Sequence, residues 1–227
     1  MAKVIELSGI VGYDITAKGL KNRLPKDGSD VILKVDSQGG SVFEGNRLYN
    51  AILDYQGNIE VHLGVLAASA ASYFPLAAGS ENIKVRANTT FMGHKAWSFA
   101  IGNADEMKAE AEILDGLDRL IAKAYSKING KSIDEILTDM SNEFWLIGGQ
   151  SVVDAGFASG VIEDEDEDEE EPITKNEVNA MIKEAKNTLQ TLEIEEDLNK
   201  WAASIKAELP ENNKKTLDSG DKITEEA

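Results

Sequence analysis

Two serines, Ser69 and Ser72, lie among small residues in the segment GVLAASAAS at residues 64–72. The segment follows a strand-like stretch and leads into an apolar stretch of helical character, so Ser69 is expected at the start of a helix. A hydroxyl there gains a favourable helix dipole and can be approached closely by a substrate. Small residues also let a helix pack closely, with Ser69 acting only as its cap. The segment alone leaves both interpretations open.

A second segment, DSQGGSV at residues 36–42, lies between a strand-like and a helix-like stretch. Its glycines let the backbone approach a ligand with N–H groups directed outward, so the turn could bind an oxyanion, or it could be an ordinary tight turn. His94 ends a further strand-like piece. Ser69, His94 and the glycine turn together supply the nucleophile, base and oxyanion donor that acyl transfer requires. His62 lies in an apolar strand without an evident partner, and we expect it to be structural.

Composition narrows the choice of chemistry. The chain has 227 residues, of which 42% are hydrophobic, enough for one catalytic domain with additional segments. It has no cysteine, which excludes disulfides, thiolate metal sites and cysteine nucleophiles, and it has only two histidines.

The net charge of -18 comes mostly from residues after 162, and Lys and Arg do not cluster, so we expect no nucleic-acid partner. The absence of a long apolar run or a signal-peptide pattern predicts a cytoplasmic protein without membrane contact.

Residues 1–162 alternate between short strand-like and longer helix-like stretches, which predicts a single α/β domain with a largely parallel sheet. The expected strands are residues 4–11, 31–35, 59–65, 83–86 and 90–94. The expected helices are residues 16–24, 42–55, 70–78 and 105–128.

The remainder of the chain is predicted to differ from this domain. Residues 163–171 are nine consecutive carboxylates followed by Pro172, so residues 163–173 are interpreted as a solvated acidic linker. Residues 174–227 are interpreted as a tail, with two amphipathic helices in 174–207 and a disordered polar end. The tail could be a solubilising appendage or a docking and assembly segment.

Several of these segments together resemble a known family. The string DSQGGSVFEGNRLYNAI resembles the glycine-containing region of the Clp protease proteolytic subunit (ClpP), GVLAASAASYFPLAAG resembles its nucleophile helix, and FMGHKAW stands where the family has its catalytic histidine. ClpP-like bacteriophage prohead proteases are the most similar group, particularly over GNADEMKAEAEILDGLDRLIAKAYSKINGKSIDEI. The resemblance covers residues 4–162. It implies the crotonase-like spiral of ββα units that this family adopts, usually assembled as stacked rings.

Carried over residue by residue, the resemblance implies that Ser69 is the nucleophile and His94 the general base. Ser72 is the second candidate for the nucleophile. The backbone N–H groups of Gly40 and Ala70 would form the oxyanion hole.

For the third member of the triad, the family pattern places an acidic residue before an aromatic one, which selects Glu143, with Asp139 as a competing candidate. The backbone around Gly39 and Ser41 would bind an extended peptide substrate. The resemblance implies no metal and no cofactor.

The implied activity is that of a serine endopeptidase acting through an acyl-enzyme. For a prohead protease the substrates would be phage scaffold and capsid proteins, cleaved during head maturation in the host cytoplasm, and the tail would be a scaffold-like segment that is removed autocatalytically. Two alternatives remain. One is an acyl-CoA hydratase or isomerase, which shares the spiral fold and a backbone oxyanion hole; the other is a non-catalytic capsid-assembly protein with a decayed protease domain.

Overall fold

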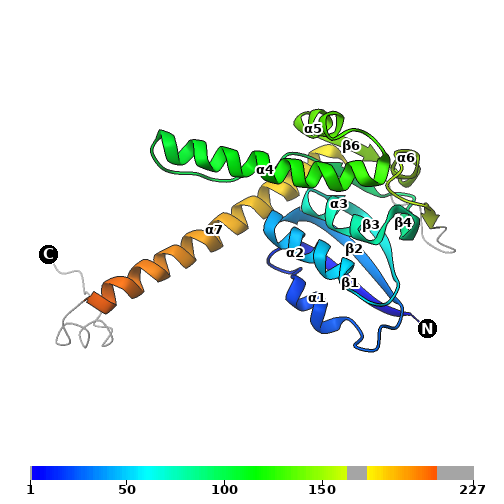
Figure 1. Ribbon diagram of the computed structural model, residues 1–227, viewed down its shortest axis with the longest axis horizontal. Coiled ribbons are helices and arrows are strands. Elements are labelled where there is room, and N and C mark those ends of the chain that lie inside the picture. Colours follow the sequence, from blue (N-terminus) through cyan, green and yellow to red (C-terminus); the bar gives the residue numbers. More distant parts are fainter. Residues whose placement is uncertain (1, 163–172, 209–227) are drawn as a thin grey trace. The chain divides into compact units, whose positions relative to one another are not determined.

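The computed structural model describes residues 2–162 and 173–208, with side chains described as far as residue 192. It shows a mixed α/β fold built on a seven-stranded sheet in the order β1-β2-β3-β4-β7, with β5 pairing β3 and β6. All of these pairs are parallel except β5 with β6. Figure 1 shows α1, α2 and α3 gathered along one face of the sheet. The α/β class and the largely parallel sheet are therefore confirmed.

The strands are bounded as follows: β1 Lys3–Val11, β2 Val31–Gly40, β3 Ile59–Ala68, β4 Ile83–Arg86, β5 Thr90–Gly93, β6 Phe144–Ile147 and β7 Gly160–Ile162. The helices are α1 Ala17–Arg23, α2 Val42–Leu53, α3 Ala70–Tyr73, α4 Ala104–Asn129, α5 Ile133–Ser141, α6 Gly149–Asp154 and α7 Lys175–Glu208. Two 3-10 helices, Phe74–Ala78 and Ser80–Asn82, follow α3.

Side chains of the central strands alternate between two apolar layers, as the two-residue period of a strand requires. Ala67 on β3 and Phe91 on β5 belong to the main core beneath the helices. Leu66, Ala68 and Met92 belong to a second layer together with residues of α7. The two faces of this part of the sheet are thus covered by different segments of the chain.

Strand β2 is longer than the sequence predicts. Instead of turning after Val35 it continues to Gly40, because Gly39 and Gly40 pair with β1 after a shift in register. Both glycines have positive φ, at 92° and 145°, which other residues rarely adopt. The expected glycine turn is therefore the irregular end of a strand, and Ser41 follows it directly as the N-cap of α2.

Strand β3 also extends beyond its predicted end and joins two partners in succession. Its first half pairs with β4, at Val61–Leu63, and its last residues pair with β5, at Leu66–Ala68. The extra length carries the chain across to β5. It is this crossing that brings Ser69 next to the end of β5.

Residues 175–208 form one continuous helix where the sequence predicts two. The described residues up to Leu189, including the start of α7, belong to one compact unit. Val178 and Ile182 of α7 pack with Leu66, Ala68 and Met92, and Ala185 on the same face of the helix is buried as well. The acidic linker, apart from Ile173, and the polar end beyond residue 208 lie outside the described residues.

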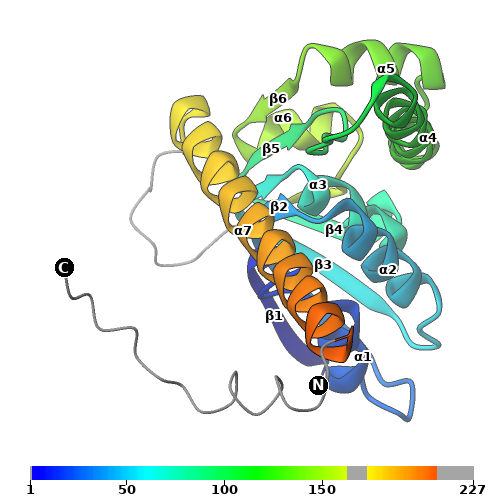
Figure 2. The same ribbon diagram turned by 90° about the vertical axis from the view of Figure 1, so that its left-hand side faces the viewer.

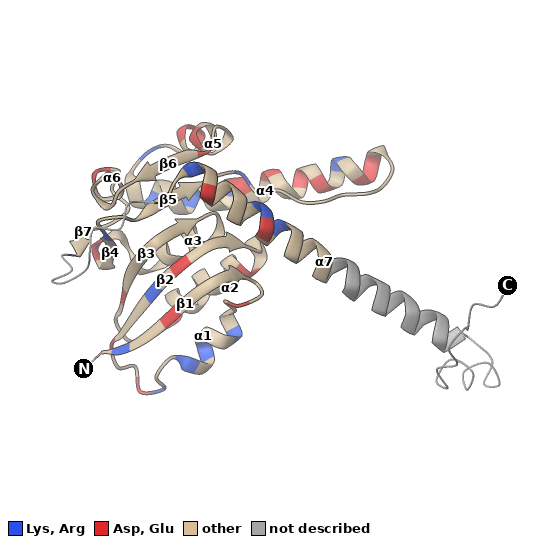
Figure 3. Cartoon of the chain, turned by 180° about the vertical axis from the view of Figure 1, so that it is seen from behind, with Lys and Arg blue, Asp and Glu red and all other residues tan. Residues whose placement is uncertain are grey.

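The outer face of β1 and β2 carries both signs of charge, and Figure 3 shows Lys and Arg interspersed with Asp and Glu along these two strands. Glu6 on β1 lies opposite Lys34 on β2 in the register. Opposite charges on neighbouring strands stabilise a sheet modestly. No helix in the described part of the chain is long and apolar enough to cross a membrane.

Candidate active site

Two parallel strands end side by side and bring a serine and a histidine together. Ala68 at the end of β3 pairs with Met92 on β5, and the N–H of Ser69 donates to the carbonyl of Met92 at 2.9 Å. His94 follows β5 at the same edge of the sheet, as expected for parallel strands. Ser69 Oγ lies 2.7 Å from Nε2 of His94. This is the distance at which a histidine can take a proton from a serine.

Ser69 has a strained backbone, with φ 55° and ψ -124°. A non-glycine residue in this region costs roughly 1 to 3 kcal/mol, and such residues cluster at functional sites. Its carbonyl is held from two directions, because both the N–H and the Oγ of Ser72 donate to it, at 3.0 and 2.7 Å. The turn therefore fixes the direction of the Ser69 side chain.

Ser72, the second candidate for the nucleophile, is completely buried. Besides the carbonyl of Ser69, its Oγ contacts the hydroxyl of Tyr125 at 2.5 Å. Both interactions keep the Ser72 hydroxyl in the core, where it supports Ser69 rather than facing His94.

His94 is held predominantly neutral by its surroundings. Burial and, to a smaller extent, the ammonium group of Lys186 lower the pKa of His94, the carboxylate of Glu143 raises it, and the net result is a pKa of about 4. A neutral imidazole can accept the Ser69 proton. The sequence did not indicate a role for Lys186, which lies on α7. Helical spacing predicts an apolar face on this helix but does not show which surface that face packs against.

Glu143 lies near His94 because of the antiparallel pairing of β5 with β6. Gly93 pairs with Phe144, so His94 and Glu143 are the next residues beyond the last pair of the two strands. Glu143 is exposed, has φ 53°, and makes no hydrogen bond to His94 among the described residues. Its influence on His94 in this structure is therefore electrostatic.

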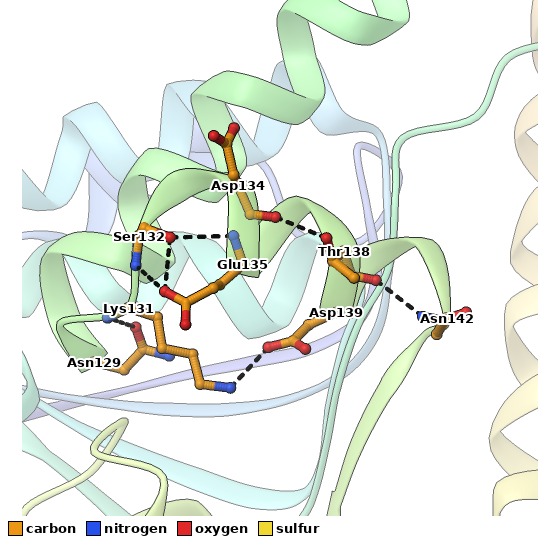
Figure 4. Close-up of polar contacts among 8 residues, drawn as sticks. All are labelled: Asn129, Lys131, Ser132, Asp134, Glu135, Thr138, Asp139 and Asn142. Carbon is orange, nitrogen blue, oxygen red and sulfur yellow. Dashed lines mark hydrogen bonds and ion pairs between the residues drawn. The ribbon is translucent and has the colours of Figure 1, made fainter.

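Asp139, the competing third member, points elsewhere. Its carboxylate accepts a hydrogen bond from Nζ of Lys131 at 2.8 Å, and the pair is partly exposed to solvent. Figure 4 shows this pair at the start and end of helix α5, beside the capping contacts of Ser132 and Glu135. The carboxylate of Asp139 is thus engaged in fixing α5.

The backbone of Gly39 passes directly beside the serine. A Cβ atom on Gly39 would lie 2.5 Å from Cβ of Ser69 and 2.9 Å from the nitrogen of Ala70. No side chain fits in this space. The N–H of Gly39 donates to Oγ of Ser37 at 3.0 Å, which fixes the approach of the two backbones.

Gly40 and Ala70 are the predicted oxyanion donors. The N–H of Ser41 donates to the carbonyl of Val11 on β1 at 2.8 Å. Gly40 follows Gly39, whose backbone lies against Ser69, so its N–H is close to the serine in the sequence of the glycine segment. Ala70 is the first residue of α3, where an N–H has no acceptor within the helix.

Ser41, predicted to bind substrate, has a structural contact as well. Its Oγ accepts from the N–H of Glu44 at 3.4 Å and so caps helix α2. Its carbonyl group accepts the first hydrogen bond of that helix, from Gly45 at 2.9 Å. The cap fixes the point where the glycine segment leaves the sheet.

His62 has a partner that the sequence analysis missed. Its Nε2 lies 2.5 Å from Oε1 of Glu60, and the same carboxylate oxygen accepts from Nζ of Lys84 at 3.2 Å. Glu60 is two residues away on the same strand, and residues at that spacing share a face. This cluster lies on β3 and β4, away from Ser69, and supports the structural interpretation of His62.

Asp118 is a further residue that sequence analysis missed. It is only 4% exposed, and its Oδ1 accepts from the N–H of Ala96 at 2.7 Å, which ties the loop after His94 to helix α4. Burial raises the pKa of this carboxyl, while the Ala96 hydrogen bond lowers it. The sequence did contain a signal, since Asp118 shares helical spacing with three buried residues, Ile121, Ala122 and Tyr125.

No group of three or more His, Asp or Glu side chains within the described ranges is placed to hold a metal ion. At the edge of the sheet the structure brings together the hydroxyl of Ser69 and the imidazole of His94, with the carboxylate of Glu143 nearby and the backbone of Gly39 against Ser69.

The low pKa of His94 predicts a loss of stability in mild acid. An unfolded histidine titrates near 6.5 and folded His94 at about 4, so between these values the unfolded chain binds more protons. The contribution of His94 to the free energy of unfolding is then complete above pH 6.5 and falls by about 3 kcal/mol as the pH drops through 4. Urea denaturation at several pH values, compared between wild type and His94→Asn, should show a steeper decline for wild type. Parallel curves would contradict a buried neutral imidazole.

Comparison with known proteins identifies the family to which the chain belongs. The Clp protease family model matches residues 20–165. The ATP-dependent Clp protease proteolytic subunit 1 of Leifsonia xyli subsp. xyli is 24% identical over 151 residues, covering 66% of this chain and 76% of the relative. The proteolytic subunit of Ligilactobacillus salivarius is 24% identical over 164 residues, covering 70% and 83%. That of Phaseolus vulgaris is 28% identical over 128 residues, covering 56% and 65%. The chain belongs to the Clp protease family.

Proposed function

We propose that the chain is a serine endopeptidase that hydrolyses peptide bonds through an acyl-enzyme on Ser69. The observation that carries the proposal is the 2.7 Å hydrogen bond between Ser69 Oγ and His94 Nε2. Membership in the Clp protease family indicates the same chemistry. The strained backbone of Ser69, held by Ser72, supports it further, because the serine is fixed in the direction of the base.

In the proposed mechanism Ser69 Oγ attacks the scissile carbonyl carbon while Nε2 of His94 takes the hydroxyl proton. The N–H groups of Gly40 and Ala70 stabilise the resulting oxyanion, each donor contributing on the order of 3 kcal/mol. His94 then gives its proton to the leaving amine nitrogen, and the peptide bond breaks. A water molecule releases the acyl group by the same steps in reverse order.

A fluorophosphonate probe tests the proposal, since it reacts with a serine activated by a neighbouring base. We expect mass spectrometry to locate the label on the peptide that contains Ser69 and to find none after His94→Ala. A chain that is folded but never labelled at Ser69 would contradict the proposal. It would leave room for the two alternatives, an acyl-CoA hydratase or isomerase and a non-catalytic assembly protein, neither of which the comparisons support.

Glu143 is proposed to assist His94 electrostatically. Glu143→Gln removes the charge that favours the imidazolium, so we expect the labelling rate to fall by about 10- to 100-fold, less than for a buried triad carboxylate. Asp139→Asn is the matched control, because it removes a carboxylate engaged by Lys131, and its labelling rate should stay within about twofold of wild type. A larger effect of Asp139→Asn would reverse the two roles.

The proposed substrates are extended peptide segments that pair with the backbone of Gly39 and Ser41. We further propose a homo-oligomeric ring that processes phage scaffold and capsid proteins during head maturation in the host cytoplasm, with removal of the tail by the enzyme itself. The similarity of residues 102–136 to phage prohead proteases supports this assignment. Mass spectrometry of the chain expressed with its scaffold and coat proteins would test it, and an intact tail throughout capsid assembly would count against self-removal.

A further inference from the structure

Helix α7 packs on one face of the sheet, beside the strand ends that carry the candidate active site. Its buried side chains Val178, Ile182 and Ala185 are spaced four and three residues apart, so they form a single apolar face. Val178 and Ile182 of this face contact the layer that contains Ala68 and Met92. Ala68 immediately precedes Ser69, and Met92 lies two residues before His94. Figure 2 shows the first turns of α7, in yellow, beside β5 and on the opposite side of the sheet from α3.

Polar contacts fix the start of this segment on the domain. Oγ1 of Thr90 on β5 donates to the carbonyl of Ile173 at 2.9 Å. The Lys175 ammonium lies 5.2 Å from the ring centre of Trp145 on β6. Thr174 and Glu177 form reciprocal capping hydrogen bonds, so the helix begins at a defined point on this surface.

One residue of α7, Lys186, contacts the segment that follows His94. Nζ of Lys186 lies 4.5 Å from the ring centre of Trp97, in the exposed segment that follows His94. From there its positive charge disfavours protonation of His94, while the carboxylate of Glu143 favours it. Acyl transfer passes through an imidazolium, and a fixed cation nearby opposes that charge. The docked helix therefore lies beside the strand ends that carry Ser69 and His94, and it contacts the segment after His94 through Lys186 and Trp97.

We propose that residues 173–189 are an inhibitory segment, and that α7 must leave the Ser69–His94 edge before protein substrates are hydrolysed. The proposal rests on the peptidase function proposed above and adds its regulation. In the sequence the segment follows the acidic run at residues 163–171. When α7 leaves the sheet, residues 173–189 therefore stay tethered to the domain through that run.

The test introduces a carboxylate on the docked face of the full-length chain. Ile182→Glu places a charge in the apolar contact, while Ala180→Glu places the same charge on an exposed position of the same helix. We expect Ile182→Glu to raise the rates of fluorophosphonate labelling and of fluorescein-casein hydrolysis at least about 10-fold, and Ala180→Glu to stay within about twofold of wild type. A synthetic peptide of residues 173–189 should restore inhibition of the Ile182→Glu chain.

The outcomes separate this proposal from the peptidase assignment. Labelling at Ser69 that is equally fast in wild type and Ile182→Glu would overturn the inhibitory role and leave the peptidase function standing. Absence of labelling in all chains would overturn the peptidase function. If Ile182→Glu does not fold, Ile182→Ala, which only shortens the side chain, should give the same increase, and an unchanged or lower rate would overturn the proposal.

A second measurement does not depend on activity. In a His62→Asn background the remaining histidine signals in an NMR spectrum belong to His94, so its titration can be followed directly. Lys186→Met keeps the packing of the aliphatic side chain and removes its charge, and we expect the pKa of His94 to rise above about 4. An unchanged titration would show that Lys186 does not lie at the site in solution.

Discussion

Replacing Ser69 with alanine is expected to abolish fluorophosphonate labelling and to lower the rate of peptide hydrolysis by about 10⁴-fold or more. The reason is that His94 would have no hydroxyl from which to take a proton, and no other serine hydroxyl contacts its imidazole within the described residues. The change removes one oxygen atom from a partly exposed side chain, so circular dichroism and the urea midpoint should stay close to wild type. Hydrolysis of fluorescein-casein, measured for the same chains, gives the size of the effect.

Ser72→Ala is the matched control for that experiment. It removes an equivalent oxygen three residues away, but one that contacts the Ser69 carbonyl and the Tyr125 hydroxyl in the core. We expect about 1 to 2 kcal/mol lower stability with labelling of Ser69 retained. If Ser72→Ala abolished the label while Ser69→Ala kept it, the two serines would have to exchange roles and the proposed mechanism would fail.

The sequence singled out Ser69 and His94, which the structure brings into contact, but it did not predict the backbone that positions them. Small residues around Ser69 and a histidine at a strand end indicate acyl transfer because each residue type is limited to a few roles. Neither pattern shows that β3 leaves β4 and continues along β5, which depends on pairing between distant segments. The hydrogen bond from Ser69 N–H to the Met92 carbonyl is a consequence of that pairing.

The part played by α7 could not be predicted for a related reason. Its helical period was evident in the sequence. The apolar spacing of Val178, Ile182 and Ala185 fits a helix that packs one face against another part of the protein. The acidic run before it suggested a separate tail, because like charges resist packing. Which surface the helix covers depends on the second apolar face of β3 and β5, whose alternating residues appear in the sequence only as a continuous apolar run.

Gly39→Ala is expected to have the second large effect on activity. It displaces the backbone that positions Ser69 and leaves the candidate catalytic side chains themselves unchanged. The new Cβ atom would lie 2.5 Å from Cβ of Ser69 and 2.6 Å from the carbonyl oxygen of Ala68, at a residue with φ 92°. Both neighbours belong to β3 and the turn after it, so neither can move without displacing Ser69. We expect a labelling rate at least about 100-fold lower and a free energy of unfolding reduced by about 2 to 4 kcal/mol.

Gly130→Ala separates the clash from backbone strain in that experiment. Gly130 ends α4 with φ 76°, and a Cβ atom there would meet nothing within 4 Å. It should therefore lose only about 1 kcal/mol of stability and keep the wild-type labelling rate. Urea denaturation and labelling of both variants give the comparison. If Gly39→Ala resembled Gly130→Ala in both measurements, the glycine segment could not lie against Ser69, and the N–H of Gly40 would lose its place as an oxyanion donor. The close approach of the Gly39 backbone to Ser69 thus excludes a side chain at residue 39, and the proposed position of the Gly40 N–H depends on the same approach.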